Sequence, residues 1–531
     1  MLRTSGVKRI LGGMPLAAEL DWALRGKGKP VGGFKLEELR DALPEWCEQC
    51  RQSPLLEAKG KKILIFATLH YWVGHATLSA LALRGMGHEV TLATLPYANW
   101  QKALNKFDMR KRELYIADVL SPASDLINHV SFSQDADPLS LPSRLMEAVE
   151  HISVMDVQYS LQVEDVDKES ELYQLRLARN SAAAAAAFAW IQAEEPDVVI
   201  LPNGLILEFG AVFHAAKEAD LPVVSYEFGE QRERIWLAQN NSVMLQDTEA
   251  MWAARSELSL DDGQRKKVTE LFSTRQQADL FQNFYRRWQE VPSEGAQQVR
   301  KTLSLDGRPI VLLAANVIGD SLTLGRAIFS GDMSSWLRRS VEHFATREDV
   351  QFVLRVHPGE RNLEGPSVAE LIEQALPELP GHMRIVKAGD PINTYDLIAA
   401  ADLGLVYTTT VGMEMAMSGL PVIVVGQTHY RGKGFTQDPQ SWEEYFEGLD
   451  TSLANLEESR PNEDEVNRAW HYAYRFFFDY PQIFPWHLLH FWEDVKNYSL
   501  ENLYSDEGQE QFRRSFDYLC GEAFDWQRRE V

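Results

Sequence analysis

The chain has 531 residues, 45% of them hydrophobic, which is enough for two or three domains with large cores. It carries 53 basic and 77 acidic residues, and the formal net charge of −24 argues against nucleic acid and against broad adhesion to an anionic membrane. No apolar run reaches about 18 residues, the length of a membrane span. Glu19 and Asp21 come too early for a secretory leader, and the three cysteines suggest a reducing compartment, so we expect a cytoplasmic protein.

The pattern of residues 1–60 predicts short helices broken by glycines, and we expect this segment to form a helical extension. Its strongest helix is Leu36–Cys47, in a polar stretch where Cys47 and Cys50 are expected to face solvent without binding zinc. The first strand of a new domain begins at Lys61. From there the pattern predicts a strand at 61–68, a loop at 69–75, a helix at 76–84 and a strand at 90–94.

Residues 97–190 are mostly helical in pattern, and strands follow at 197–201 and 222–226. Asn203 comes directly after the first of these strands and Glu227 after the second. Ligands of parallel sheets bind at the carboxyl ends of the strands, so both side chains are candidates for a site. Residues 245–300 predict connecting helices, in which Asp261 is expected to cap a helix.

A second set of buried strands begins at Pro309. The stretch Ala401–Gly426 reads as a strand (Leu403–Tyr407), a threonine-rich turn, a short helix (Met413–Ser418) and a second strand (Pro421–Val425). Free N–H groups at such a helix start favour an anion, typically a phosphate. The candidate ligands there are Thr408, Thr409, Thr410, Gly412 and Glu414, of which Glu414 is expected to accept hydrogen bonds from a sugar hydroxyl. The ordinary alternative is that the threonines only cap the helix.

The strand Phe352–Val356 is broken by Pro358, and it delivers Arg355 and His357 to a strand end. The loop after the strand at 309–314 brings Asn316 to the same edge. The order of these features is RVHP, then DPINTYDLIAAADLGLVYTTTVGMEMAMSGLPVIVVG, then HYRGKGFT.

This motif order resembles the bacterial capsular polysaccharide biosynthesis glycosyltransferases, a GT-B group related to Kdo-transferases and to sialyltransferases with a His-Pro motif. The specific part spans about residues 308–436. The resemblance implies an α/β fold of two Rossmann-like domains facing across a cleft. The expected divisions are a helical extension at 1–60, an acceptor domain with helical insertions at 61–300, a nucleotide-sugar domain at 301–460, and C-terminal helices at 461–531 that cross back to the first domain. The aromatic residues between 470 and 492 are then expected to be core.

The resemblance also implies roles in the first domain. The loop after the first strand points into the cleft of GT-B enzymes, which makes His70, Tyr71 and Gly74 acceptor-binding candidates, together with Asn203. The relatives place their general base at an acidic residue followed by x-Gly, and Glu227-x-Gly229 matches that pattern. His75 is the second candidate for the base.

In the second domain, His357, the threonine turn and the backbone near Gly412 are expected to bind the leaving phosphate, supported by Arg355, Asn316 and Lys433. Residues 428–436, which carry Lys433, predict a glycine-flexible loop that closes over the donor; the alternative is an exposed basic turn. There is no convincing Asp-x-Asp pair, so we expect no metal and no cofactor.

The sequence therefore predicts transfer of a sugar from a nucleotide-sugar donor, CMP- or UDP-linked, to a saccharide or glycolipid acceptor. A peripheral contact with the inner face of the plasma membrane is left open. Two enzymes of the same fold are the alternatives: a nucleotide-sugar 2-epimerase and a CDP-glycerol-type glycerophosphotransferase. The third alternative is a binding module of the same fold that has no catalytic activity. The donor sugar, the acceptor and the stereochemistry are not readable from the residues.

Overall fold

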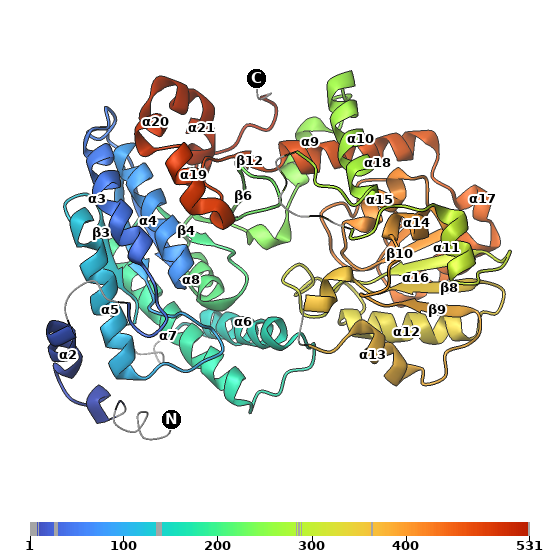
Figure 1. Cartoon of the computed structure of the whole chain (residues 1–531), viewed down its shortest axis with the longest axis horizontal. Helices are drawn as coiled ribbons and strands as arrows, with labels where there is room; N and C mark the ends of the chain where they lie inside the picture. Colours follow the sequence, from blue (N-terminus) through green and yellow to red (C-terminus); the bar gives the residue numbers. More distant parts are fainter. Residues whose placement is uncertain are drawn as a thin grey trace. The chain divides into compact units, whose positions relative to one another are not determined.

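The computed structural model describes residues 8, 10–25, 30–133, 141–282, 284, 287, 289–362 and 365–528. The chain divides into two compact units (Figure 1). Unit 1 comprises Met1–Asp156, Asp167–Met244 and Gln482–Phe524, and unit 2 comprises Val157–Val166, Leu245–Pro481 and Asp525–Val531. Each unit holds its own parallel sheet covered by helices, which confirms the expected α/β class. None of the helices in the described part of the chain combines the length and hydrophobicity that a bilayer crossing requires.

Unit 1 is built on a seven-stranded sheet in the order β12-β6-β5-β4-β1-β2-β3. Ile65 at its centre lies beside Leu92 of β2 and Ile200 of β4, both in parallel register. The five strands from β3 to β5 are parallel, and β6 and β12 add an antiparallel edge that the apolar pattern did not predict. The strands are β1 (Lys62–Ala67), β2 (Glu89–Thr94), β3 (Asn128–Ser131), β4 (Val198–Pro202), β5 (Val223–Glu227), β6 (Arg234–Gln239) and β12 (Gln482–Ile483).

In unit 1, the helix α4 begins earlier than the sequence predicted. Residues 69–75 are not a loop, because α4 begins at His70: Leu69 adopts a left-handed conformation with φ 63° and turns the chain directly from β1 into the helix. The helices are α2 (Ala17–Arg25), α3 (Glu37–Arg51), α4 (His70–Gly85), α5 (Lys106–Leu120), η1 (Ser121–Ala123), α6 (Ser143–Leu161), α7 (Glu171–Glu194), α8 (Leu207–Glu218), η6 (Leu488–His490), α19 (Phe491–Asn497), α20 (Leu500–Tyr504) and α21 (Asp506–Leu519).

The expectation that the two cysteines of α3 face solvent is also wrong. Cys47 and Cys50 are buried, because α3 packs this face against α4. The Cys50 thiol lies 3.4 Å from the carbonyl oxygen of Leu81 in α4. The thiols are therefore part of the packing that holds the N-terminal extension on unit 1.

Unit 2 is built on a five-stranded parallel sheet in the order β11-β10-β7-β8-β9. Leu313 of β7 pairs with Leu354 of β8 on one side and Leu405 of β10 on the other. The chain runs outward from β7 in both directions, so the strand order reverses between β7 and β10. Ligands of such sheets bind outside the carboxyl ends of the strands at this reversal. The strands are β7 (Ile310–Ala314), β8 (Gln351–Arg355), β9 (Met383–Val386), β10 (Leu403–Val406) and β11 (Val422–Val424).

The core of unit 2 lies between this sheet and its helices, with Trp336, Phe344 and Tyr445 fully buried in it. Asp261 caps α10 through a capping box, as the sequence predicted. The helices are α9 (Glu249–Arg255), α10 (Asp262–Gln276), α11 (Ala296–Thr302), α12 (Met333–Ala345), η4 (Pro358–Asn362), α13 (Val368–Ala375), α14 (Thr394–Ala400), α15 (Val411–Met417), α16 (Trp442–Ala454), α17 (Leu456–Ser459), α18 (Glu463–Tyr474) and the π-turn η5 (Arg475–Asp479), and η3 (Val243–Leu245) spans the division at 244/245.

The boundary between the two units lies earlier than the expected position near residue 300. It falls at 244/245, since α10 packs on α18 and α11 on α14, all within unit 2. The C-terminal segment returns to unit 1 at Gln482. Its aromatic residues are buried in both units, including Tyr472 and Phe476 in unit 2 and Phe484 and Trp486 in unit 1.

Candidate functional site

A cavity of about 160 Å³ lies in unit 2 at the carboxyl edge of the sheet, where the strand order reverses. The ends of β7, β8 and β10 all contribute to its wall. The side chains that the sequence singled out there are Arg355, His357 and Thr409. The full lining is Arg287, Gln289, Glu290, Ala314, Ala315, Arg355, His357, Pro358, Gly359, Arg361, Thr394, Thr409 and Val411.

Arg355, the last residue of β8, supplies a buried positive charge to this cavity. Its side chain is only 4% exposed, and Nη1 donates to the carbonyl oxygen of Lys387 at 2.7 Å. Nε lies 3.5 Å from the hydroxyl of Thr394. No carboxylate in the described part of the chain forms an ion pair with it. Burial lowers the pKa of Arg355 to about 10, so the group stays protonated at neutral pH and calls for an anion.

The ring of His357 is fixed by its own turn. The N–H of Gly359 donates to Nδ1 at 3.0 Å, so in the neutral ring the proton sits on Nε2. A Cβ atom at Gly359 would lie 2.9 Å from Nδ1, so this bond needs a glycine. His357 is partly exposed and lines the cavity.

Only one of the three threonines in this turn lines the cavity. Thr409 lines the cavity, but Thr408 is buried, and its N–H donates to the Asn316 side chain at 3.2 Å. Asn316 therefore ties the end of β10 to the loop after β7 and is not among the residues of the cavity wall. Thr410 makes no side-chain capping bond, and α15 has only seven residues. The positive charge of the site thus comes mainly from arginine side chains.

Gly412 has a structural role, because the lack of a side chain there allows neighbouring residues to pack closely. A Cβ atom there would lie 2.3 Å from the hydroxyl of Tyr430 and 2.7 Å from Val406. The same hydroxyl donates to the carbonyl oxygen of Thr409 at 2.7 Å, which holds the turn in place. The glycine lets the loop that carries Tyr430 approach the turn.

Glu414 is a structural residue, contrary to the expectation that it binds a sugar hydroxyl. Its Oε1 atom lies 2.8 Å from Nη1 of Arg275 in α10, and both side chains are buried. Tyr395 adds a second hydrogen bond to the carboxylate. The pair joins α10 to α15 inside unit 2.

The loop 428–436 is not a lid, which is a second correction. His429 stacks on Phe476 with ring centroids 3.7 Å apart, and the Lys433 side chain is buried in an ion pair with Glu249. Arg431 donates to the carbonyl oxygens of Val424 and Pro439. The aromatic residues of α18 and η5 cover the loop, so Lys433 cannot reach the cavity.

Glu227 ends β5 at the carboxyl edge of the sheet of unit 1. Its Oε1 atom accepts from the N–H of Phe228 at 3.0 Å, and Oε2 lies 3.5 Å from the amide nitrogen of Asn203. Asn203 adopts a left-handed conformation with φ 62°, and its Oδ1 accepts from the N–H groups of the turn that leads into α8. Burial raises the pKa of Glu227 to about 7, the range suited to a general base at neutral pH.

His75 lies inside the core of unit 1, and the structure does not favour it as the base. It is 1% exposed and enclosed by Trp72, Tyr226 and Phe228, and Nε2 lies 3.3 Å from the carbonyl oxygen of Trp486. Burial lowers the pKa of His75 to about 3. The ring therefore has no route to a substrate hydroxyl.

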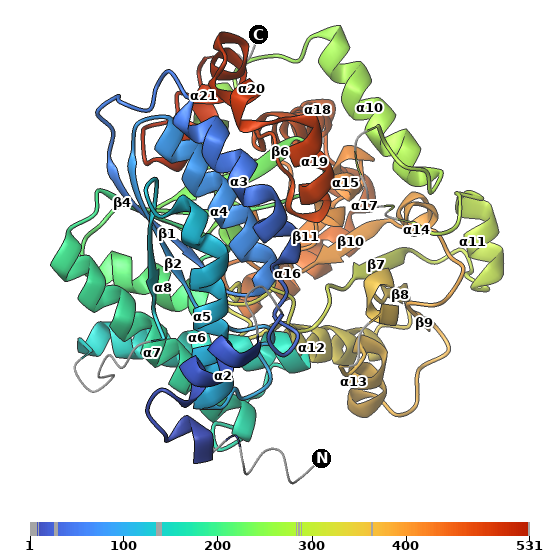
Figure 2. The same cartoon turned by 60° about the vertical axis from the view of Figure 1, so that its left-hand side comes forward.

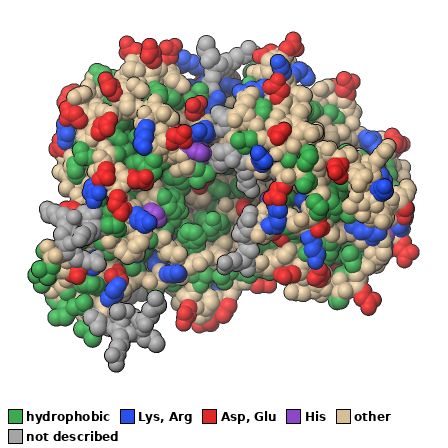
Figure 3. Space-filling view, in the orientation of Figure 1, with side chains coloured by type: hydrophobic (Ala, Val, Ile, Leu, Met, Phe, Trp, Pro, Cys, Tyr) green, Lys and Arg blue, Asp and Glu red, His purple; other side chains and the backbone are tan. Residues whose placement is uncertain are grey.

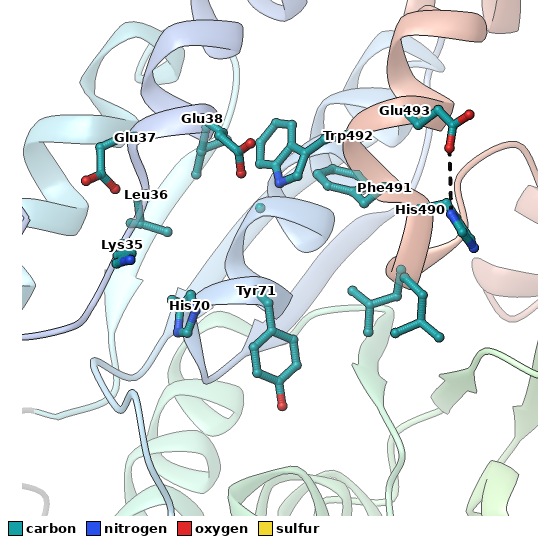
Figure 4. A pocket seen from close by; sticks show the side chains of 14 residues that line it. Lys35, Leu36, Glu37, Glu38, His70, Tyr71, His490, Phe491, Trp492 and Glu493 are labelled. Atoms are coloured by element: carbon teal, nitrogen blue, oxygen red, sulfur yellow. Dashed lines mark ion pairs between the residues drawn. The ribbon is translucent and has the colours of Figure 1, made fainter.

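Unit 1 contains a larger cavity of about 630 Å³ (Figure 4). In Figure 4, His70 and Tyr71 stand on one side of it and Trp492 on the other, and Gly74 also lines it. Three of the four acceptor-binding candidates thus lie in one cavity, and Asn203 does not. The lining comprises residues 35–39, His70, Tyr71, Gly74 and residues 488–493.

Sequence reasoning named three of the fourteen residues that line this cavity and missed the other eleven. Its walls come from the start of α3 and from η6 and α19, which are more than 400 positions apart. Trp492 was assigned to the core as part of an aromatic stripe. Its ring does stack on Trp46, with centroids 5.9 Å apart, and its indole nitrogen faces the cavity (Figure 4). In residues 488–493, the only feature of the sequence that pointed to a binding site was a tryptophan close to two polar residues, Glu493 and His490. No group of three or more potential metal ligands is assembled among the residues that the structure describes.

Residues 273–451 match the family model described as capsule polysaccharide biosynthesis protein, which confirms the resemblance drawn from the motifs. No curated protein matches the sequence. Among solved structures, the chain is similar to the Thermosulfurimonas dismutans KpsC beta Kdo 2,4 transferase (17% identity, 55% of this chain and 83% of that one, TM-score 0.35). It is also similar to the calicheamicin glycosyltransferase CalG4 (14%, 82% and 98%, 0.26) and to the UDP-GlcNAc 2-epimerase of Neisseria meningitidis (12%, 79% and 99%, 0.25). These TM-scores are low, so the argument on function rests on the matched segment and on the site.

Proposed function

We propose that this protein is a glycosyltransferase of the GT-B type that moves a sugar from a nucleotide-sugar donor to a saccharide or glycolipid acceptor in capsular polysaccharide synthesis. The observation that carries the proposal is Arg355. A buried arginine that forms no ion pair with any carboxylate of the described residues lines a cavity at the reversal point of a parallel sheet, beside the ring of His357. The cavity lies within the segment that matches the capsule family.

The donor phosphate is the anion that we assign to this cavity. Breaking the bond between sugar and phosphate leaves negative charge on the leaving phosphate, and fixed cations and N–H donors stabilise that charge. Arg355, the Nε2–H of His357 and the Thr409 hydroxyl supply them. Arg361 also lines the cavity, where it is paired with Glu290, so this pair carries no net charge. Because Arg355, His357 and Thr409 stabilise the charge, we propose that transfer does not need a metal ion.

The acceptor is assigned to the cavity of unit 1. Its aromatic rings from Tyr71 and Trp492 suit the apolar faces of sugar rings, and its carboxylates from Glu37 and Glu38 suit sugar hydroxyls. Glu227 lies at the carboxyl edge of the same sheet, where it takes the proton of the attacking hydroxyl. A carboxyl with a pKa near 7 accepts that proton and releases it between turnovers.

Nucleotide binding is the first test. A nucleotide that binds only the folded protein raises its melting temperature, so CMP, UDP, GDP and CDP are compared at equal concentrations. The nucleotide that stabilises most is then used as a sugar donor with oligosaccharide acceptors, with and without EDTA, and EDTA is expected to leave the rate unchanged. Conversion of UDP-GlcNAc without any acceptor would assign the protein to the epimerases instead, and turnover of CDP-glycerol to the glycerophosphotransferases.

His357→Ala is expected to weaken nucleotide binding without unfolding unit 2. A hydrogen bond to a charged phosphate contributes about 1.5–3 kcal/mol, since the anion has few other donors at this point. Affinity measured by calorimetry should therefore fall about tenfold to a hundredfold. His357→Gln keeps an N–H donor and should lose less. Unchanged affinity in His357→Ala would remove this residue from the site.

A further inference from the structure

We propose that the N-terminal apolar surface, formed by Ile10, Met14, Leu16, Leu20 and Leu24, docks this protein on an anionic lipid bilayer. These side chains are 69%, 56%, 67%, 64% and 87% exposed. Ten large hydrophobic side chains are exposed in the described part of the chain, and half of them fall in this short stretch. Figure 3 shows hydrophobic side chains gathered at the lower left, over α2.

Helix α2 packs on α5 through the face opposite its exposed leucines. Ala18 is buried, and Trp22 packs on Tyr115 of α5 with ring centroids 5.9 Å apart. Leu20 and Leu24 are one turn apart on the opposite side of the helix, since successive residues turn by about 100°. Figures 1 and 2 both show α2 beside one end of α5.

The acidic groups of α2 are neutralised by α5. Glu19 pairs with Arg110 at 2.7 Å and Asp21 with Lys111 at 2.5 Å. Neither carboxylate is therefore left as an unbalanced charge beside the exposed leucines. The outer side of α2 presents apolar side chains with little negative charge to oppose an anionic surface.

The sequence around this surface is basic. Residues 1–30 contain six basic and two acidic side chains, a net charge of +4, whereas the whole chain carries −24 and the remainder therefore −28. One of the six, Lys8, pairs with Asp108. An apolar helix flanked by cations binds at the interface of anionic membranes, which attract Lys and Arg. A second copy is the poorer occupant, because it would bring the basic N-terminal stretches of two chains together. The basic residues are Arg3, Lys8, Arg9, Arg25, Lys27 and Lys29.

Vesicle flotation with the full chain tests this inference, and it needs neither donor nor acceptor, so it stands apart from the proposed reaction. We expect the protein to float with vesicles of phosphatidylcholine and phosphatidylglycerol in equal amounts, and not with phosphatidylcholine alone. Leu20→Glu/Leu24→Glu should lower binding about tenfold or more, since it removes apolar contact and adds negative charge. Leu280→Glu/Leu379→Glu changes two exposed leucines of unit 2 in the same way and should bind like the wild type.

A charge variant separates a loss of docking from a loss of folding. Arg25→Gln/Lys27→Gln/Lys29→Gln keeps the leucines, and its binding should fall and lose its dependence on salt. The inference is overturned if the wild type stays unbound with anionic vesicles, or if both N-terminal variants bind as the wild type does. It is equally overturned if ultracentrifugation shows a dimer that Leu20→Glu/Leu24→Glu dissociates while no vesicle binding occurs.

Discussion

Glu227→Gln is expected to lower kcat by about 10²–10⁴-fold, the usual contribution of a general base. Gln keeps the shape of the side chain and its hydrogen-bonding ability but does not accept a proton at neutral pH. The nucleotide cavity belongs to unit 2, so nucleotide affinity should stay as in the wild type. Steady-state kinetics with saturating donor and acceptor, together with calorimetry of the nucleotide, measure both quantities.

The pH profile gives a second readout of the same residue. The base must be ionised to act, and burial raises the pKa of Glu227 to about 7. The rate kcat/KM should therefore fall about tenfold per unit below pH 7 and level off above it. Glu227→Gln should lose this limb of the profile.

Two outcomes would contradict the role of Glu227. If only the acceptor KM rises and kcat stays within about threefold of the wild type, the residue positions the acceptor and another group is the base. The control is Glu218→Gln at the far end of α8, which should leave both constants unchanged because that end lies away from the carboxyl edge. If Glu218→Gln lowered the rate equally, the effect would not report on the site.

Glu414→Ala is expected to lower the free energy of unfolding by about 3–5 kcal/mol, because it leaves the Arg275 guanidinium buried without its partner. Urea denaturation followed by tryptophan fluorescence measures this loss. The matched control is Glu373→Ala. Its partner Lys387 lies 3.1 Å away, and both side chains are more than half exposed. An exposed pair contributes about 0–1 kcal/mol, so the control should change little.

A double variant distinguishes the buried pair from a substrate contact. Arg275→Met/Glu414→Met removes both charges and should recover much of the stability that Glu414→Ala loses, as apolar replacements of buried pairs often do. Nucleotide affinity should be near that of the wild type. A stable Glu414→Ala variant with weakened donor binding would instead return Glu414 to the site.

The central strands were predictable because strands buried on both faces of a parallel sheet are continuous apolar runs. The strands expected at 61–68, 197–201, 309–314 and 403–407 appear as β1, β4, β7 and β10 with ends shifted by at most one residue. The short edge strands β3 and β12 lack such runs and were missed, and the six-residue strand β6 between β12 and β5 was missed as well. The position of His357 was also predictable, since Pro358 ends the strand and leaves the histidine at the carboxyl edge.

The surroundings of polar side chains were not predictable from local pattern. Glu414, Lys433 and His75 sit beside turns or strand ends, as site residues do, yet all three are buried in the structure. The partner of Glu414 lies 139 positions away along the chain and that of Lys433 lies 184 away. Spacing along a strand or helix fixes which face a side chain occupies, but not which distant segment covers that face.

The sequence by itself determined two α/β halves, the strand ends that carry Arg355, His357 and Glu227, and the similarity of residues 273–451 to the capsule polysaccharide biosynthesis family model. These features depend on contiguous residues, whose apolar runs and breaking prolines act locally. Only the tertiary structure decided that Arg355 forms no ion pair with a carboxylate of the described residues, while Glu414 pairs with Arg275. It also decided that residues 35–39 and 488–493 enclose the cavity beside His70. Both outcomes depend on packing between segments far apart in the chain, where burial makes an unpaired charge costly and so selects its partner.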